Sequence, residues 1–179
     1  MNKLRRILLY GFGPYGEFRD NITARIIKSL PPQPGLKRVV FPVRFSRAQF
    51  VDPIKRIQPD MVLGLGQSSR RRIDVESQAL NHRRARRTDK TRLISPSGPK
   101  RLLTTLNVKV GRLAGKSVNA GDYVCNFSMY VMLDHIQRKG LDIPYGFIHI
   151  PHDCDQQKAI GFVAKILRRC LRANIQTQN

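Results

Sequence analysis

Short apolar runs alternate with helical patterns along this chain, and their order limits the possible folds more than any other feature. Several runs are continuous stretches of Val, Ile and Leu, which is typical of strands in a sheet covered on both faces. We expect strands at residues 6–11, 38–43, 61–66, 73–76 and 145–150, and helices at residues 21–30, 46–57, 99–113 and 122–138. This order predicts an α/β fold, a three-layer α/β/α sandwich with an open, mostly parallel twisted sheet.

The last part of the chain has the clearest helical pattern. Asp155 is a suitable N-cap, and apolar residues then recur at intervals of three and four, at positions 159, 162, 163, 166, 167, 170 and 171. The pattern places Cys170 in the core. Because 179 residues suffice for one domain with a substantial core, we expect a single domain over residues 1–179.

The charge is strongly positive. Lys and Arg number 33 against 12 Asp and Glu, a net charge of +21, and the excess is concentrated between Arg70 and Arg92 and on the last helix. Such an excess favours nucleic acid, an anionic surface or an acidic partner. However, the sequence has no RNP aromatic motif, zinc-finger spacing, GXXG loop or recognisable helix-turn-helix. We therefore expect incidental polyanion binding rather than specific nucleic-acid recognition.

The cysteines are few and widely spaced, at positions 125, 154 and 170. They form no Cys-x-x-Cys pair, so neither a disulfide framework nor a cysteine zinc site is indicated. His152 has no partner at ligand spacing on its strand, so we expect no metal and no cofactor. The N-terminal apolar run at residues 7–10 is too short for a signal peptide or a membrane span. A reducing, cytoplasmic location is the simplest expectation.

Cys125 lies just inside an expected helix start. With Asp122 as the N-cap, Cys125 falls near N3, where the helix dipole would favour the thiolate that a cysteine nucleophile needs. The alternative is ordinary packing beside Val124 and Phe127, because cysteine is among the most buried residue types. A base and an orienting acid elsewhere in the chain would decide between the two.

Three predicted strand ends carry the other candidate residues. The turn after the first strand, residues 11–16, presents Phe12 and Tyr15, but its spacing fits neither a dinucleotide nor a Walker A loop. Glu76 ends a later strand, and His149 lies in the apolar last strand. Taken singly, Glu76 would be a surface carboxylate paired with an arginine, and His149 a core histidine. In open parallel sheets, however, functional groups gather at the carboxyl ends of strands.

Taken together, these motifs resemble the pyroglutamyl peptidase type I family, also called pyrrolidone-carboxylate peptidases, over nearly the whole chain. The turn at residues 11–16 is similar to the family's GFGPFG turn, and residues 147–151 to its FIHVP motif. Residues 120–126 resemble its AGxYVCN nucleophile motif, and residues 59–67 its strand ending in Gly-Gln. Further family positions are matched by Asn21, Glu76, Ala79, Asn81, Ala85, Arg86 and Asp89.

The resemblance implies a cysteine exopeptidase that removes an N-terminal pyroglutamyl residue through a thioester. Its catalytic triad would be Cys125 as the nucleophile, His149 as the base and then the acid, and Glu76 orienting the imidazole. Backbone amides around Cys125 would stabilise the oxyanion, with help from Arg86. The resemblance also implies substrate contacts for Phe12, Tyr15, Asn21, Gln67 and Arg86.

Two departures from the family are visible. Residues 67–72 read Gln-Ser-Ser-Arg-Arg-Arg where the family has Gln-Ala-Gly-Gly-Arg, and the stretch from Asp89 to Cys125 is shorter than in typical members. Both changes bear on the substrate tail or on oligomeric contacts, and a homo-oligomer is compatible with the sequence. Two alternatives stay open at this point. One is a noncatalytic homologue that binds RNA or another polyanion, and the other is an acyl-transfer enzyme acting on a different amide.

Overall fold

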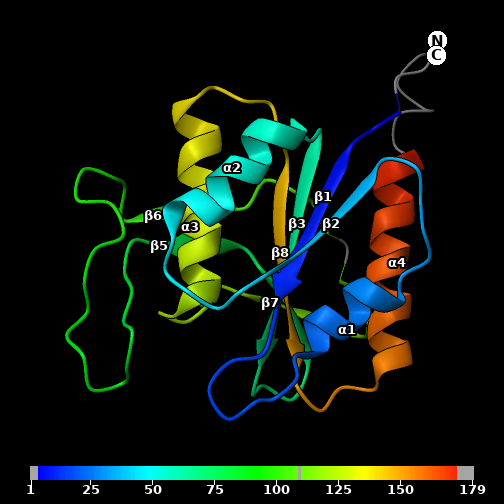
Figure 1. Cartoon of the computed structure of the whole chain (residues 1–179), viewed down its shortest axis with the longest axis horizontal. Helices are drawn as coiled ribbons and strands as arrows, with labels where there is room; N and C mark the ends of the chain where they lie inside the picture. The colour runs from blue at the N-terminus through cyan, green and yellow to red at the C-terminus, as the bar shows by residue number, and fades with distance from the viewer. Residues whose placement is uncertain (1–3, 109, 173–179) are drawn as a thin grey trace.

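The computed structural model describes residues 4–108 and 110–172, which form a central six-stranded sheet with helices on both faces (Figure 1). The strand order is β2-β1-β3-β8-β4-β7, and every neighbouring pair is parallel except β4 and β8. This arrangement confirms the predicted α/β fold with a mostly parallel sheet. The strands are β1 (Ile7–Phe12), β2 (Leu36–Phe41), β3 (Met61–Ser68), β4 (Ile73–Glu76), β7 (Ala114–Ser117) and β8 (Tyr145–Pro151).

The four helices form the two outer layers. Helices α2 (Arg47–Ile57) and α3 (Val124–Arg138) cover one face of the sheet, while α1 (Ile22–Ser29) and α4 (Gln156–Arg172) cover the other (Figure 1). A separate apolar cluster fills the space on each side of the sheet. Helix α3 also contacts the two-stranded sheet of β5 (Gln78–Leu80) and β6 (Arg101–Leu103), so most of its side chains are buried. Burial on both faces explains why the central strands are continuous apolar runs.

Three helices start where the sequence predicts. Asn21 caps α1 by accepting from the Thr23 N–H at 3.0 Å, and Ser46 caps α2. Asp155 accepts from the Lys158 N–H at 2.8 Å at the start of α4. Cys170 is partly buried and packs on the cluster between α4 and the sheet, as the helical pattern predicts. None of the helices in the described part of the chain is long and apolar enough to cross a membrane.

The predicted helix at residues 99–113 is wrong. This segment contains β6, which pairs antiparallel with β5, then irregular backbone at residues 104–108 and a turn at residues 111–113 before β7. Two of its backbone hydrogen bonds go to distant parts of the chain: the Thr104 N–H donates to the Ser77 carbonyl between β4 and β5, and the Leu106 N–H donates to the Tyr145 carbonyl in β8. Tertiary pairing therefore overrides the weak helical pattern of the segment.

Candidate active site

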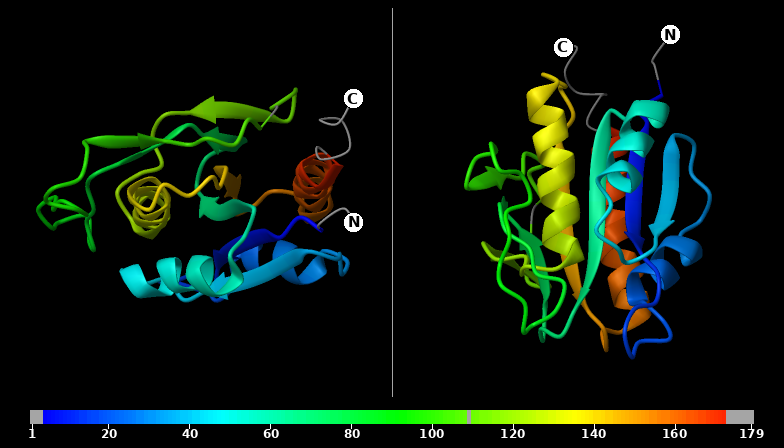
Figure 2. Two further views of the ribbon diagram at one scale, coloured as in Figure 1. Left: turned by 90° about the horizontal axis from the view of Figure 1, so that it is seen from above. Right: turned by 60° about the vertical axis from the view of Figure 1, so that its left-hand side comes forward.

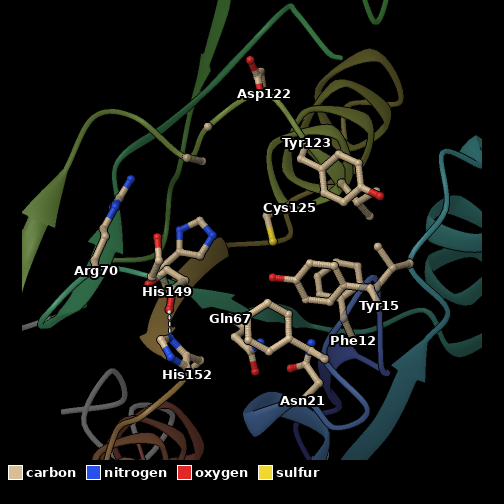
Figure 3. A pocket seen from close by; sticks show the side chains of 17 residues that line it. Phe12, Tyr15, Asn21, Gln67, Arg70, Asp122, Tyr123, Cys125, His149 and His152 are labelled. Carbon is tan, nitrogen blue, oxygen red and sulfur yellow. Dashed lines mark hydrogen bonds between the residues drawn. The ribbon is translucent and has the colours of Figure 1, made fainter. Parts of the chain in front are cut away.

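A cavity of about 400 Å³ opens between the carboxyl ends of β1, β3 and β8 and the start of α3. Figure 3 shows the Cys125 sulfur pointing into this cavity, with the His149 imidazole on one side and Tyr15 on the other. The structure thus brings together residues that are distant in the sequence. The sequence-predicted residues that line the cavity are Phe12, Tyr15, Asn21, Gln67, Cys125 and His149.

The His149 imidazole is paired with the Glu76 carboxylate. His149 Nδ1 lies 2.7 Å from Glu76 Oε1, and both side chains are buried, with residue exposures of 4% and 0%. Strand β4 runs antiparallel to β8, so that Glu76 faces Phe147 and Asp74 faces His149. Glu76 therefore reaches His149 along the diagonal of the pleat rather than from a shared carboxyl edge, which corrects the expected placement.

Glu76 is held as an anion. Burial on its own would raise the pKa of this carboxyl. The hydrogen bond and charge of His149, together with Ser117 and Arg70, outweigh burial and leave the pKa below its ordinary value. An ionised Glu76 accepts the Nδ1 proton of His149, which leaves Nε2 as the unprotonated base.

Cys125 is the second residue of α3. The N-cap is Tyr123, which makes no side-chain capping bond, whereas the predicted cap, Asp122, pairs with Arg84. Burial, the larger effect, and the charge of Glu76 raise the pKa of the Cys125 thiol to about 12, while Arg70 acts in the opposite direction. The net rise is opposite to the lowering expected at a helix start. Cys125 would therefore need a base to remove its proton before acting as a nucleophile.

The start of α3 also supplies backbone donors. First-turn amides of a helix have no intrahelical acceptor, and no side chain caps this helix. Gly121, two residues before the N-cap, has a φ of +81° and lines the cavity together with Ala120. This turn brings the chain along the cavity to the start of α3, so that the uncapped first turn lies beside the Cys125 sulfur.

The cavity wall opposite His149 is aromatic and amide-bearing. Phe12 is almost fully buried, and Tyr15 packs against Phe18 with ring centroids 5.3 Å apart. Asn21 is used internally, because its Oδ1 caps α1 and its Nδ2 donates to the Gly13 carbonyl at 3.1 Å. Asn21 therefore holds the aromatic turn in place.

Gln67 is the wall residue with spare hydrogen-bonding capacity. Its Oε1 accepts from the Ile22 N–H at 2.9 Å. Its Nε2 is buried and has no well-aligned hydrogen-bond partner among the described residues. The Tyr15 hydroxyl interacts with the Gln67 side chain across the cavity. A buried amide without a full set of partners is a candidate donor to a bound polar group.

Two arginines differ from expectation. Arg86 is exposed on the loop after β5 and is absent from the cavity lining, and its N–H donates to Asp89, so its position does not support the expected substrate contact. Arg70, which the sequence did not single out, lines the cavity and binds Glu76. The available signal was Asp74 and Glu76, two carboxylates on one face of a buried strand, because such a pair requires a cation.

Comparisons with known proteins agree on one family. The model of the family described as pyroglutamyl peptidase matches residues 5–161. The pyrrolidone-carboxylate peptidase 1 of Caldanaerobacter subterraneus is 33% identical over 167 residues, which are 82% of each chain. A pyrrolidone-carboxylate peptidase of Saccharolobus islandicus is 29% identical over 81% of this chain and 78% of its own length.

Solved structures show the same fold. The pyrrolidone carboxyl peptidase from Thermococcus litoralis superposes with a TM-score of 0.85 at 22% identity, covering 98% of this chain and 97% of its own. A mutant pyrrolidone carboxyl peptidase from Pyrococcus furiosus gives 0.81 at 24% identity, covering 93% and 98%. The family model matches most of the length of this chain, Cys125 and His149 line one cavity, and Glu76 binds His149 from behind, so this chain belongs to the pyroglutamyl peptidase family.

Proposed function

We propose that this protein is a cysteine exopeptidase that removes an N-terminal pyroglutamyl residue from peptides. The observation that carries the proposal is that His149, which lines the same cavity as the Cys125 thiol, is paired with the buried Glu76, with Nδ1 and Oε1 2.7 Å apart. A thiol, an imidazole and an orienting carboxylate are the groups that acyl transfer through a thioester requires. The family match and the pyrrolidone-carboxylate peptidase relatives support the same activity.

Each residue has a defined step. His149 Nε2 takes the Cys125 proton as the thiolate attacks the carbonyl that joins the pyroglutamyl group to the next residue. The amides at the start of α3 stabilise the resulting oxyanion. His149 then protonates the leaving amine, which departs as the shortened peptide. Water, deprotonated by His149, hydrolyses the thioester, releases pyroglutamate and restores the thiol. Glu76 keeps the imidazole in the required tautomer throughout.

The cavity suits the flat lactam of pyroglutamate. The aromatic rings of Phe12 and Tyr15 offer apolar faces to the ring, as we expected for these residues. The Gln67 Nε2 group, which lacks a well-placed acceptor, would donate to the lactam carbonyl. Asn21 would act indirectly by holding the turn that carries both aromatic residues. A substrate with a free α-amine would place a cation in this partly apolar space and would be excluded.

The test is cleavage of a fluorogenic pyroglutamyl amide, with a prolyl amide as the matched substrate that has the ring but lacks the lactam carbonyl. We expect the reduced wild type to cleave the first and not the second. Cys125→Ser and His149→Ala should each lose activity by about 10²-fold or more. If the wild type cleaves neither substrate, the proposed activity is wrong. If the serine variant retains wild-type activity, the nucleophile is wrong.

We also propose that polyanions bind incidentally to the loop between β5 and β6, which extends outward past α3 (Figure 2). Four of the exposed basic side chains on this loop are those of Arg86, Arg87, Lys90 and Arg92. Binding to heparin should weaken steeply with salt, since released counterions drive it. Replacing these four residues with alanine should reduce the salt slope and leave peptidase activity unchanged. A slope equal to that of the wild type would contradict the assignment of the loop.

Two broader proposals accompany the activity. We propose that residues 1–179 form a single peptidase domain, supported by the family match over residues 5–161. We propose that the protein works in the cytoplasm, supported by three free cysteines at positions 125, 154 and 170 and by the need of the nucleophile for a reduced thiol. Cell fractionation with a tagged protein tests the second proposal.

A further inference from the structure

Arg70 makes an unusually dense set of contacts at the wall of the cavity. Its Nη1 atom donates to Glu76 Oε1 at 2.9 Å, to Asp74 Oδ2 at 3.1 Å and to Ser117 Oγ at 3.1 Å. Its Nη2 atom donates to the backbone carbonyl of Asn119. Glu76 Oε1 is also the oxygen that lies 2.7 Å from His149 Nδ1. Arg70 and His149 therefore bind the same oxygen of the orienting carboxylate.

These contacts connect separate parts of the active site. Glu76 belongs to β4, Ser117 ends β7, and Asn119 begins the turn that leads to the nucleophile. The turn is held locally, because Asn119 Oδ1 accepts from the Gly121 N–H at 2.9 Å. The guanidinium of Arg70 thus joins the carboxylate that orients the base to the segment that positions Cys125.

Arg70 is also the cation that compensates the charge of the buried Glu76 carboxylate. Asp74 and Glu76 lie on one face of β4, with residue exposures of only 5% and 0%. Arg72 binds the other side of Asp74, with Nε 3.0 Å from Oδ1, and forms no hydrogen bond or ion pair with Glu76 among the described residues. Glu76 Oε2 has no hydrogen-bond partner among the described residues. The position of the Glu76 carboxylate therefore depends on the two residues that bind Oε1, His149 and Arg70. Burying this carboxylate without a cation would cost free energy.

We propose that Arg70 is a positioning residue of the catalytic triad, which fixes Glu76 Oε1 against His149 and ties the triad to the turn before Cys125. The proposal rests on the proposed peptidase function. It assigns a role to one of the basic residues that replace the glycines of the family pattern at residues 67–72. Part of the positive charge of the chain then belongs to the active site and not to a general polyanion surface.

The charge of Arg70 should also affect the reactivity of Cys125. Arg70 lowers the pKa of this thiol, whereas burial and the charge of Glu76 raise it. Other titratable residues that line the cavity are Tyr15, Asp122, Tyr123, His149 and His152, and the buried hydroxyls of Tyr10 and Tyr145 also interact electrostatically with Cys125. These groups remain when Arg70 is removed. The loss of Arg70 alone should therefore shift the pH dependence of thiol alkylation toward higher pH.

The experiment compares Arg70→Ala, Arg70→Gln and Arg70→Lys with Arg72→Ala as the matched control, since Arg72 binds the same Asp74 carboxylate. We expect kcat of the first two variants to fall between about 10- and 100-fold with a smaller change in KM, because the triad loses its alignment. Arg70→Lys keeps the charge but cannot bridge the Glu76 carboxylate and the Asn119 carbonyl at the same time, so partial activity is expected. Millimolar guanidinium should restore part of the activity of Arg70→Ala, whereas Arg72→Ala should need no rescue.

A second readout does not depend on the substrate. Iodoacetamide alkylation of Cys125 is measured against pH, with Cys154 and Cys170 replaced by serine in every protein. An alkaline shift in Arg70→Ala and Arg70→Gln, absent in Arg72→Ala, supports the proposal even if the wild type fails to cleave pyroglutamyl substrates. Unchanged alkylation profiles together with a kcat loss no larger than that of Arg72→Ala would overturn it. Thermal melting identifies any variant that is unfolded, and the conclusion then rests on the others.

Discussion

Cys125, the proposed nucleophile, has a thiol whose environment disfavours the reactive thiolate. Burial raises the pKa of its thiol to about 12, and the negative charge of Glu76 contributes to the rise. A raised thiol pKa disfavours the thiolate at neutral pH, so the proposed mechanism needs His149 to remove the proton during attack. Glu76 has two opposing effects: it orients the base, and it disfavours the thiolate.

These opposing effects predict that Glu76→Gln changes two rates in opposite directions. Without the negative charge, the Cys125 pKa falls, so that alkylation by iodoacetamide at a fixed mildly alkaline pH becomes faster. Without the acceptor for Nδ1, His149 loses its tautomer and orientation, so that kcat/KM falls by about 10²- to 10⁴-fold. Both rates are measured on the same preparation. If the alkylation rate of the wild type already reaches its plateau below neutral pH, Cys125 is a thiolate at neutral pH, and the thiol resting state is contradicted.

At the scale of the elements, β3 and β8 pack so closely that Gly66 leaves no room for a side chain. A Cβ atom at Gly66 would lie 2.8 Å from His149 Cδ2 and 2.8 Å from Phe147 Cε1. Gly66 is also the residue of β3 that pairs with His149. We expect Gly66→Ala to push the imidazole away from Glu76 and to reduce kcat by about 10²-fold, because catalysis is sensitive to misplacements of about 1 Å.

Gly161→Ala is the matched control for Gly66→Ala. A Cβ atom at Gly161, inside α4, would meet nothing within 4 Å, and the site lies on the face of the sheet away from Cys125. The control should keep full activity and melt at a higher temperature, since alanine stabilises a helix interior by about 1 kcal/mol relative to glycine. Equal activity of both variants in a fluorogenic assay would show that the β3–β8 contact does not set the position of His149.

The elements also show which parts of the molecule the sequence can predict. Strands β1, β3 and β8 are buried apolar runs, and their strong hydrophobic pattern is readable locally. Strands β5, β6 and β7 have three or four residues each with partly exposed side chains, and only their partners define them. The residues of the proposed triad were predicted from their resemblance to family motifs, because Cys125, Glu76 and His149 taken singly also fit packing or surface roles. Arg70 was not, since its role depends on strand pairing that places it beside Glu76.

At the scale of the whole molecule, the net charge of +21 should destabilise the fold through self-repulsion. Few acidic residues are available to offset it, and several of these serve local roles, such as Asp134, which pairs with both Arg47 and Arg138. Raising NaCl from about 10 mM to about 150 mM shortens the Debye length from about 30 Å to about 8 Å. Repulsion between distant exposed charges is then screened, whereas the buried contacts of Arg70 with Glu76 are affected much less.

We therefore expect the melting temperature to rise over this range of NaCl, measured by thermal denaturation followed by circular dichroism. The exposed residues Arg86 and Arg87 allow a direct check, since Arg86→Glu combined with Arg87→Glu lowers the net charge without altering the cavity. The double variant should melt at a higher temperature than the wild type at low salt and should gain less from added NaCl. If its melting temperature depends on NaCl as steeply as that of the wild type, self-repulsion is not what salt relieves, and local contacts such as those of Asp134 must account for the stability of this basic molecule.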